Sequence, residues 1–215
     1  MLRSLLATIA AAFIFALPGG AATQPDVVLN GQGWRCTSAV DIDLVKITNP
    51  PGDAITLGAG CTGRIGRIEV DTWTADGVKV SNVANWARDV VVEGGYVKCH
   101  AIAGDTHQDA VQAMGGERIR FRGVSFDCLG NSNFFVNRGG SGAVTPTDVV
   151  CEGCFFGPRS ATTVRVERSL RSGVLNSVGC RGRRVRTTFL FTPAATSPVN
   201  SGNSTLAASD PRCAR

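Results

Sequence analysis

The sequence is poor in aromatic residues and in long apolar runs. Its 215 residues include three Trp, one Tyr and two His. No Lys/Arg cluster lies beside the few aromatics, so we do not predict a nucleic-acid partner. No segment keeps helical apolar spacing for more than about ten residues, which argues against an α/β fold because that fold needs helices between its strands.

The one long apolar run lies near the N-terminus. Arg3 precedes the apolar residues 5–17, and Gly20-Ala21-Ala22 supplies small residues after them. This order is typical of a secretory signal peptide at residues 1–22, and the run is too short to span a bilayer. A buried N-terminal helix is the alternative. We therefore expect a secreted protein, extracellular or periplasmic, with no membrane segment once the signal is cleaved.

Charge and cysteine content fit that expectation. The formal net charge is +5, which suits an acidic partner. Eight cysteines are an even number, and an exported chain can pair them. Cys36 and Cys61 flank the first repeat and are in a position to pair, and a bridge from Cys213 would anchor the C-terminal tail. Aligned repeats place Cys99 over Cys128 and Cys154 over Cys180, either as bridges or as buried thiols.

A five-residue phrase recurs six times at intervals of 23 to 33 residues. Each copy is a small polar residue followed by a short strand pattern with apolar third and, mostly, fifth positions. The copies begin at Asp53, Asp76, Asp109, Asn133, Thr162 and Thr187. Two further apolar segments with period two follow most copies. Such a period indicates stacked units of about three short strands, each with one buried face.

These units predict an all-β fold, a parallel β-helix of about six short coils, because one unit alone cannot bury its apolar face. We expect an N-terminal cap at 23–50, the β-helix at 51–191 and a C-terminal tail at 192–215. An antiparallel sandwich is the alternative. The predicted interior column consists of Ile55, Val78, Val111, Phe135, Val164 and Phe189.

The longest interval contains both histidines of the chain. Asp105, His107 and Asp109 alternate there, so an extended backbone would point all three side chains to one side. Gln112 follows with outward parity on the next strand. Because insertions on one face of a solenoid often form its binding site, this stretch is the leading candidate site.

Stacking of the coils would also align Asp53, Asp76 and Asp109. Carboxylates about 5 Å apart repel by roughly 3 kcal/mol at an effective dielectric of about 20. A bound Ca²⁺, the neighbouring Lys79 or a proton on one acid would offset that repulsion. A purely structural role as turn caps is equally open, because Asn133, Thr162 and Thr187 occupy the same position without charge.

Two strand starts resemble a known superfamily. Thr74-Ala-Asp76-Gly-Val78 and His107-Gln-Asp109-Ala-Val111 are similar to motifs of right-handed parallel β-helix proteins of the pectate-lyase-like superfamily. The resemblance implies a right-handed β-helix that acts on polysaccharide as a lyase, an epimerase or a polygalacturonase-type hydrolase. Asp76 matches the acid of the hydrolases' Asn-Thr-Asp-Gly motif, with Thr74 in place of the Asn.

Three functions follow as expectations, all with an acidic polysaccharide as partner and a monomeric protein. The first is a uronate-polymer lyase or epimerase, which needs a base and a group that holds the developing charge. Its catalytic residues would be His107, Asp109, Asp76 and Lys79, with Asp76 and Asp109 as ligands of a possible Ca²⁺ and Gln112, Arg165 and Asn133 as substrate contacts.

The second function is a glycoside hydrolase with two carboxylates. Asp76 and Asp109 on neighbouring coils would have the spacing of about 5 Å typical of retaining enzymes, and Asp53 and Asp109 a wider spacing near that of inverting enzymes. The third is a non-catalytic module that binds carbohydrate or builds a surface. The sequence leaves all three open.

Overall fold

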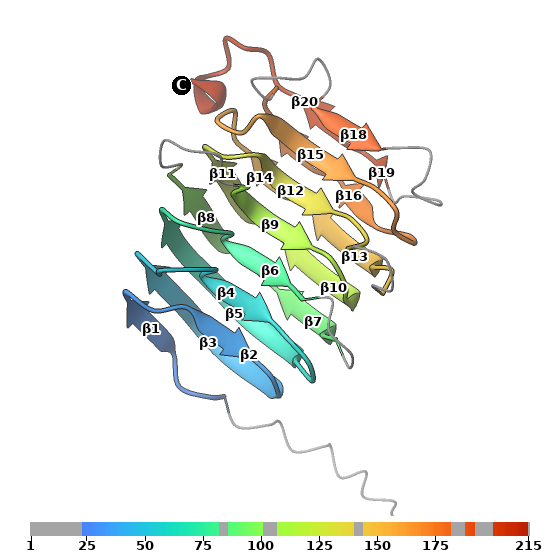
Figure 1. Ribbon diagram of the computed structural model, residues 1–215. Coiled ribbons are helices and arrows are strands. Elements are labelled where there is room, and N and C mark those ends of the chain that lie inside the picture. The colour runs from blue at the N-terminus through green and yellow to red at the C-terminus, as the bar shows by residue number, and fades with distance from the viewer. Residues whose placement is uncertain are drawn as a thin grey trace, which may run out of the picture.

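The computed structural model describes residues 23–81, 86–100, 107–139, 144–181, 188–191 and 200–214. It confirms the predicted fold, a right-handed parallel β-helix, with about five turns rather than six (Figure 1). Every pairing between named strands is parallel, which rules out the antiparallel sandwich. The predicted signal peptide lies outside the described residues.

Each full coil passes through three strand positions. The first position forms a seven-stranded sheet, here called sheet B, with one short strand from each coil. Its strands are β2 (Trp34–Cys36), β4 (Ile55–Leu57), β6 (Val78–Val80), β9 (Asp109–Ala113), β12 (Ser132–Val136), β15 (Thr162–Val166) and β18 (Phe189–Phe191).

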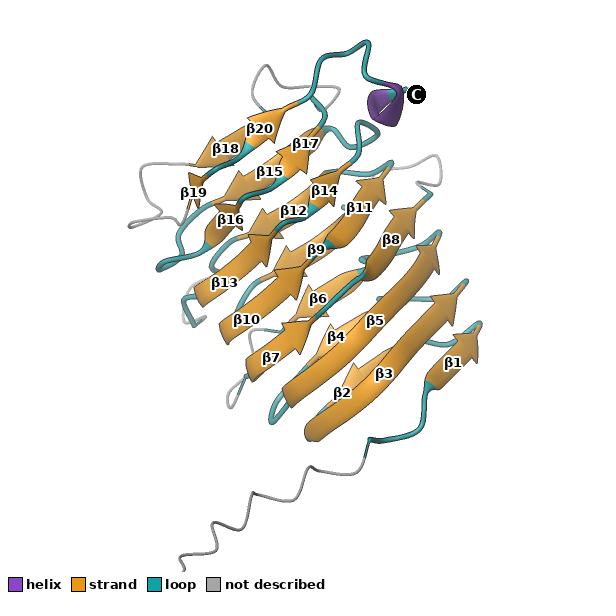
Figure 2. Ribbon diagram, turned by 180° about the vertical axis from the view of Figure 1, so that it is seen from behind, coloured by secondary structure: helices purple, strands orange, loops and turns teal. Residues whose placement is uncertain are grey.

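The second and third positions belong to one thirteen-stranded sheet, here called sheet A (Figure 2). They are continuous in the first coils because β3 (Ala39–Thr48) and β5 (Thr62–Thr72) are long. The second position continues through β7 (Arg88–Val92), β10 (Glu117–Arg122), β13 (Thr147–Glu152), β16 (Gly173–Leu175) and β19 (Asn200–Ser201). The third holds β1 (Val27–Asn30), β8 (Gly95–Cys99), β11 (Val124–Cys128), β14 (Phe155–Phe156), β17 (Val178–Gly179) and β20 (Ser204–Thr205).

The register of sheet B confirms most of the predicted interior column and corrects one coil. Val78 pairs with Ile55 and Val111, but Val111 pairs with Phe134, not with Phe135. The strand starts one residue earlier than predicted, so Ser132, not Asn133, lies opposite Asp109. Because side chains alternate along a strand, this slip buries Phe134 and turns Phe135 outward.

The core changes character along the axis. The first coils bury aliphatic residues, whereas the later ones bury Phe121, Phe126, Phe134 and Phe156, whose neighbouring ring centroids lie 5.7 to 6.4 Å apart. Between the second and third positions the chain turns sharply. Gly95 begins β8 at φ 103°, and a Cβ there would lie 1.8 Å from the Ile68 carbonyl oxygen, so only glycine fits this approach of two coils.

Three disulfides brace the coils. Cys36–Cys61 and Cys99–Cys128 each join neighbouring coils, as the sequence suggested, while Cys180–Cys213 anchors the C-terminal turn η1 (Pro211–Cys213). Cys154 therefore does not bridge to Cys180; it and Cys151 are buried free thiols. Three disulfides fit an oxidising environment. Within the described residues no helix is long and apolar enough to cross a membrane.

The first and last described strands join the same ladders. Residues 23–50 contain β1, β2 and β3, which pair in parallel with the following coil. In the C-terminal residues, β19 pairs with β16 and β20 pairs with β17. Both ends of the β-helix are thus built by strands that continue its winding.

Candidate functional site

The aspartate column predicted from the repeats is present at the entry to sheet B. Because Ile55, Val78 and Val111 are in register, the aspartates two residues before them occupy equivalent places on three coils. The backbone N–H of Asp76 donates to Asp53 Oδ1 at 3.3 Å, and that of Asp109 donates to Asp76 Oδ1 at 2.9 Å. Each carboxylate therefore caps the start of the next coil's strand.

Burial makes two of these acids unusual. Asp76 is 3% exposed and Asp109 is fully buried. Burial raises the pKa of Asp76 to about 6, against the opposing effects of the Asp109 N–H and Lys79. Burial and then the charge of Asp76 raise the pKa of Asp109 to about 7, and hydrogen bonds from Ser132 and Asn131 only partly offset this. Asp109 therefore keeps its proton to a higher pH than an ordinary aspartate does.

The structure contains two of the three ways of offsetting the repulsion named above. Lys79 Nζ lies 3.5 Å from Asp53 Oδ2 and 3.4 Å from Asp76 Oδ2, so one ammonium serves two carboxylates. Because the pKa of Asp109 is raised, this acid can keep its proton, which removes one of the repelling charges. Gln112 Nε2 also donates to Asp109 Oδ2 at 3.4 Å. In the described part of the chain, no group of three His, Cys, Asp or Glu side chains is placed to hold a metal ion.

A row of side chains follows the outer face of sheet B. The register aligns one outward residue from each strand: Arg35, Thr56, Lys79, Gln112, Phe135, Arg165 and Leu190. The Arg165 guanidinium lies 5.3 Å from the Phe135 ring centroid, and its Nε pairs with Glu167. A shallow depression at the first coils is lined by Gly33, Trp34, Arg35, Asp53 and Thr56. Lys79, Gln112 and Arg165 from the sequence prediction thus share one face.

Two other predicted residues are not part of this row. His107 is exposed, two residues before Asp109, and Asp105 lies outside the described residues. Asn133 is fully buried; its Oδ1 accepts from the Cys128 N–H at 2.7 Å and its Nδ2 donates to the Gly157 carbonyl at 2.7 Å. Asn133 therefore joins two backbone turns inside the coil and presents no polar atom to a ligand.

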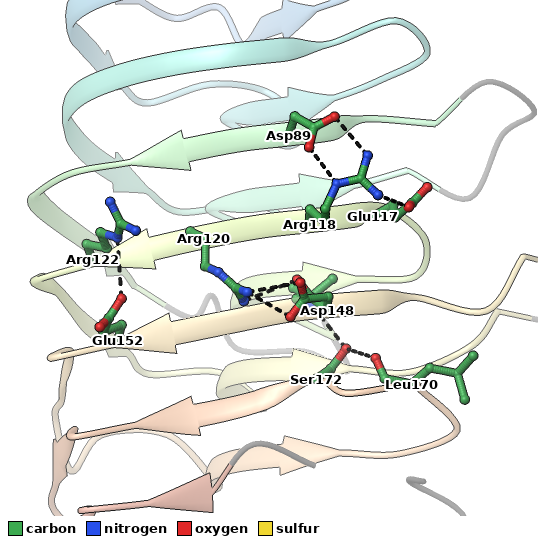
Figure 3. A network of polar contacts seen from close by, with 10 residues as sticks. Asp89, Glu117, Arg118, Arg120, Arg122, Asp148, Glu152, Leu170 and Ser172 are labelled. Carbon is green, nitrogen blue, oxygen red and sulfur yellow. Dashed lines mark hydrogen bonds and ion pairs between the residues drawn. The ribbon is translucent and has the colours of Figure 1, made fainter. Parts of the chain in front are cut away.

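The outer face of the second strand position has a different electrostatic character. Figure 3 shows Arg118 held by Asp89 and Glu117, Arg120 held by Asp148, and Arg122 held by Glu152. Arg120 Nη2 lies 2.8 and 2.9 Å from the two Asp148 carboxylate oxygens. Each of these arginines is paired with an acid of a neighbouring coil, so the charges of this face form a compensated ladder.

Pattern reasoning missed a feature of that ladder. Asp89, Arg118, Asp148 and Arg171 all have positive φ, between 50° and 58°, at the start of the second strand position. Non-glycine residues rarely adopt this conformation, and Asp is among those that tolerate it best. The alternation of acid and base in the stacked turns was visible in the sequence only after the coils had been aligned.

The sequence patterns also did not predict one cluster, in which an indole and an imidazole ring are in contact. Trp73 and His100 meet where β5 and β8 end, because Thr72 pairs with Cys99. The two residues are far apart in sequence and belong to no repeated phrase, so only the coil register brings them together.

Comparison of the chain with family models, curated proteins and solved structures found no match. The parallel β-helix expected from the resemblance to the pectate-lyase-like superfamily is confirmed by the structure itself.

Proposed function

We propose that the protein is an exported β-helix that binds an acidic polysaccharide, a polymer of uronate residues, along the outer face of sheet B. The observation that supports this proposal is the in-register row of outward side chains from Arg35 to Leu190. It offers cations, an amide and an aromatic ring at one position per coil.

The spacing of the row suits an extended polymer. Neighbouring strands lie about 4.8 Å apart, which is close to the length of one sugar residue in an extended chain. A polysaccharide that runs along the β-helix axis can therefore place successive sugars over successive coils. Phe135 provides a half-buried ring for one sugar face, and Gln112 provides a hydrogen-bonding amide.

One uncompensated cation on this face favours an acidic ligand. Arg35 is exposed and has no ion-pair partner among the described residues. Lys79 and Arg165 are paired with Asp53 and Glu167, so a uronate carboxylate would share or replace those partners. Protonation of Asp109 lowers the negative charge beneath the row, and its pKa of about 7 predicts stronger binding below neutral pH.

The setting agrees with a secreted polysaccharide binder. The disulfides fit an oxidising compartment, and the N-terminal residues 1–22 read as a signal peptide, so we place the protein outside the cytoplasm. We also propose membership of the pectate-lyase-like superfamily, on the strand-start motifs together with the right-handed winding.

Calorimetric titration with oligogalacturonate and oligoguluronate tests the binding face. Replacing Arg35 or Arg165 by Gln should weaken binding about tenfold, because one charge-assisted hydrogen bond contributes about 1.5 kcal/mol. The matched control is Arg122→Gln on the compensated face, which should bind like the wild type. A neutral glucan should not bind, and added salt should weaken binding of the uronates.

Two results would contradict the proposal. One is the absence of binding to any uronate oligomer by the wild-type protein. The other is equal loss of affinity in Arg122→Gln and Arg165→Gln, which would indicate diffuse charge attraction in place of a defined face.

A further inference from the structure

The N-terminal end of the β-helix exposes apolar side chains at positions that are buried one coil further on. Figure 1 shows β1, β2 and β3 at this end of the stack. Val27 and Trp34 are only partly buried, although both pack against the core. Their register partners in the next coil, Val45 and Ile55, are at most 1% exposed. The first coil therefore has the interior of a middle coil, but in the described chain it has a neighbour on one side only.

This end also has free strand edges. A depression of about 340 Å³ opens there, with Val27, Trp34 and Val40 among the residues that line it. Around it, β1 pairs with β3 alone and β2 pairs with β4 alone, so the outer edge of each strand has no strand partner in the described chain. The start of β3 is covered, because the Gln24 N–H donates to the Asp41 carbonyl at 2.6 Å. The free edges are therefore those of β1 and β2.

β1 lacks the features that keep an edge strand from pairing with another chain. Protected edge strands are very short, contain Lys or Pro, or are covered by another segment. The four residues of β1 are Val-Val-Leu-Asn, and Val28 is 63% exposed. At the opposite end, β19 and β20 have two polar residues each, and the Cys180–Cys213 disulfide fastens η1 next to β17. Of the two described ends, the N-terminal one is thus better suited to pairing with another chain.

The charges at this end are self-complementary. Residues 23–50 contain five charged side chains. Those that form ion pairs with side chains of β5 are Asp41, Asp43 and Lys46. Asp26 and Arg35 are exposed and have no ion-pair partner among the described residues. One unpaired acid and one unpaired base on the same end suit a two-fold contact, because there each residue meets its complement on the other copy.

We propose that two copies of this chain associate through their N-terminal ends, with Arg35 of each copy against Asp26 of the other. The contact covers the depression on both first coils, and the free edges of β1 and β2 supply backbone hydrogen-bonding groups. A second copy is the partner that matches, because one face carries both the acid and its complementary base. The product is a closed dimer, in contrast to the monomer expected from the sequence, and it does not depend on the proposed binding of polysaccharide.

Sedimentation equilibrium of the exported protein over a range of concentrations, without polysaccharide, tests the association. The wild type should approach twice the monomer mass, and added salt should shift the equilibrium toward monomer. Arg35→Gln and Asp26→Asn should each weaken the dimer about a hundredfold, about tenfold for each of the two equivalent pairs. The double variant should be no weaker than either single variant, because both substitutions remove the same contact.

The variants are chosen to leave the first coil intact. Asp26→Asn keeps an oxygen that can accept from the Leu44 N–H, which donates to Asp26 Oδ1 at 3.0 Å. Val28→Lys adds a charge to the edge of β1 and should give a monomer. The matched control is Leu170→Lys, at an apolar residue that is 44% exposed on a later coil, and it should leave the dimer intact. Thermal unfolding of each variant checks the fold.

Three results overturn this inference. The first is a wild-type protein that stays monomeric at every concentration at which it remains in solution. The second is an assembly that keeps growing with concentration, which would indicate open-ended stacking in place of a two-fold contact. The third is equal loss of the dimer in Val28→Lys and Leu170→Lys, which would indicate unspecific apolar association. None of them bears on the binding of uronate oligomers, which is measured separately.

Discussion

Replacing Asp109 by Asn should make the free energy of unfolding of the protein less sensitive to rising pH. The side chain is fully buried, and its pKa is raised to about 7 by burial and by the neighbouring charge of Asp76. Asparagine has nearly the same shape but does not ionise. Its amide oxygen can still accept from Asn131 Nδ2, which donates to Asp109 Oδ1 at 3.2 Å, and Gln112 can turn its own amide to face the new NH₂ group.

The size of the effect follows from the raised pKa. An aspartate in the unfolded chain titrates near 3.8, so between about pH 4 and pH 7 the native state binds a proton that the unfolded state has released. The free energy of unfolding therefore falls as pH rises through this window and levels off above it. A difference of about 3 pH units at 1.36 kcal/mol per unit gives a loss of about 4 kcal/mol.

Urea denaturation at intervals from pH 4 to pH 8, with disulfides intact, measures this. The free energy of unfolding of Asp109→Asn should match that of the wild type near pH 4 and exceed it by up to about 4 kcal/mol at pH 8. In the variant, Asp76, with a pKa of about 6, still makes the free energy of unfolding fall as pH rises, but by a smaller amount. Thr162→Val, a neutral change in the same column, should keep the wild-type slope. An equally steep loss in Asp109→Asn would refute the reasoning.

Two further predictions concern the register and the thiols. Phe134→Ala should lower the free energy of unfolding by about 3 to 5 kcal/mol, because it empties a core site. Phe135 points outward, so Phe135→Ala should lower the free energy of unfolding far less. The reverse order in urea denaturation would contradict the register. Cys151 and Cys154 are buried free thiols, and burial raises the pKa of Cys151. An alkylating reagent should therefore label neither thiol in the native protein, and it should label both after unfolding without reductant. Mass spectrometry counts the labels, and rapid labelling of the native protein would speak against their burial.

The fold was predictable because the repeat appears directly in the residues. Parallel pairing places equivalent positions of successive coils next to one another, so a recurring polar residue before a short apolar strand implies a column of those residues. Asp53, Asp76 and Asp109 satisfy that implication. The prediction failed at Phe135 because a turn that is one residue shorter exchanges the two faces of a strand, and turn length is weakly encoded in the sequence.

The candidate site was less predictable than the fold. Lys79, Gln112 and Arg165 lie on one face as expected, since outward parity follows from the strand pattern. The burial of Asp109 and the contact of His100 with Asp71 did not follow from the pattern, because they depend on how the side chains of neighbouring coils pack.

The sequence of this protein was enough to predict the winding and the aspartate column and to show that Cys36 could pair with Cys61, because each needs only a repeated spacing and parallel stacking. The tertiary structure decided which face Phe134 occupies, how strongly Asp109 holds its proton, and that Asp71, Trp73 and His100 meet. These outcomes depend on distances across coils, and such distances exist only once the turns between strands have set the register.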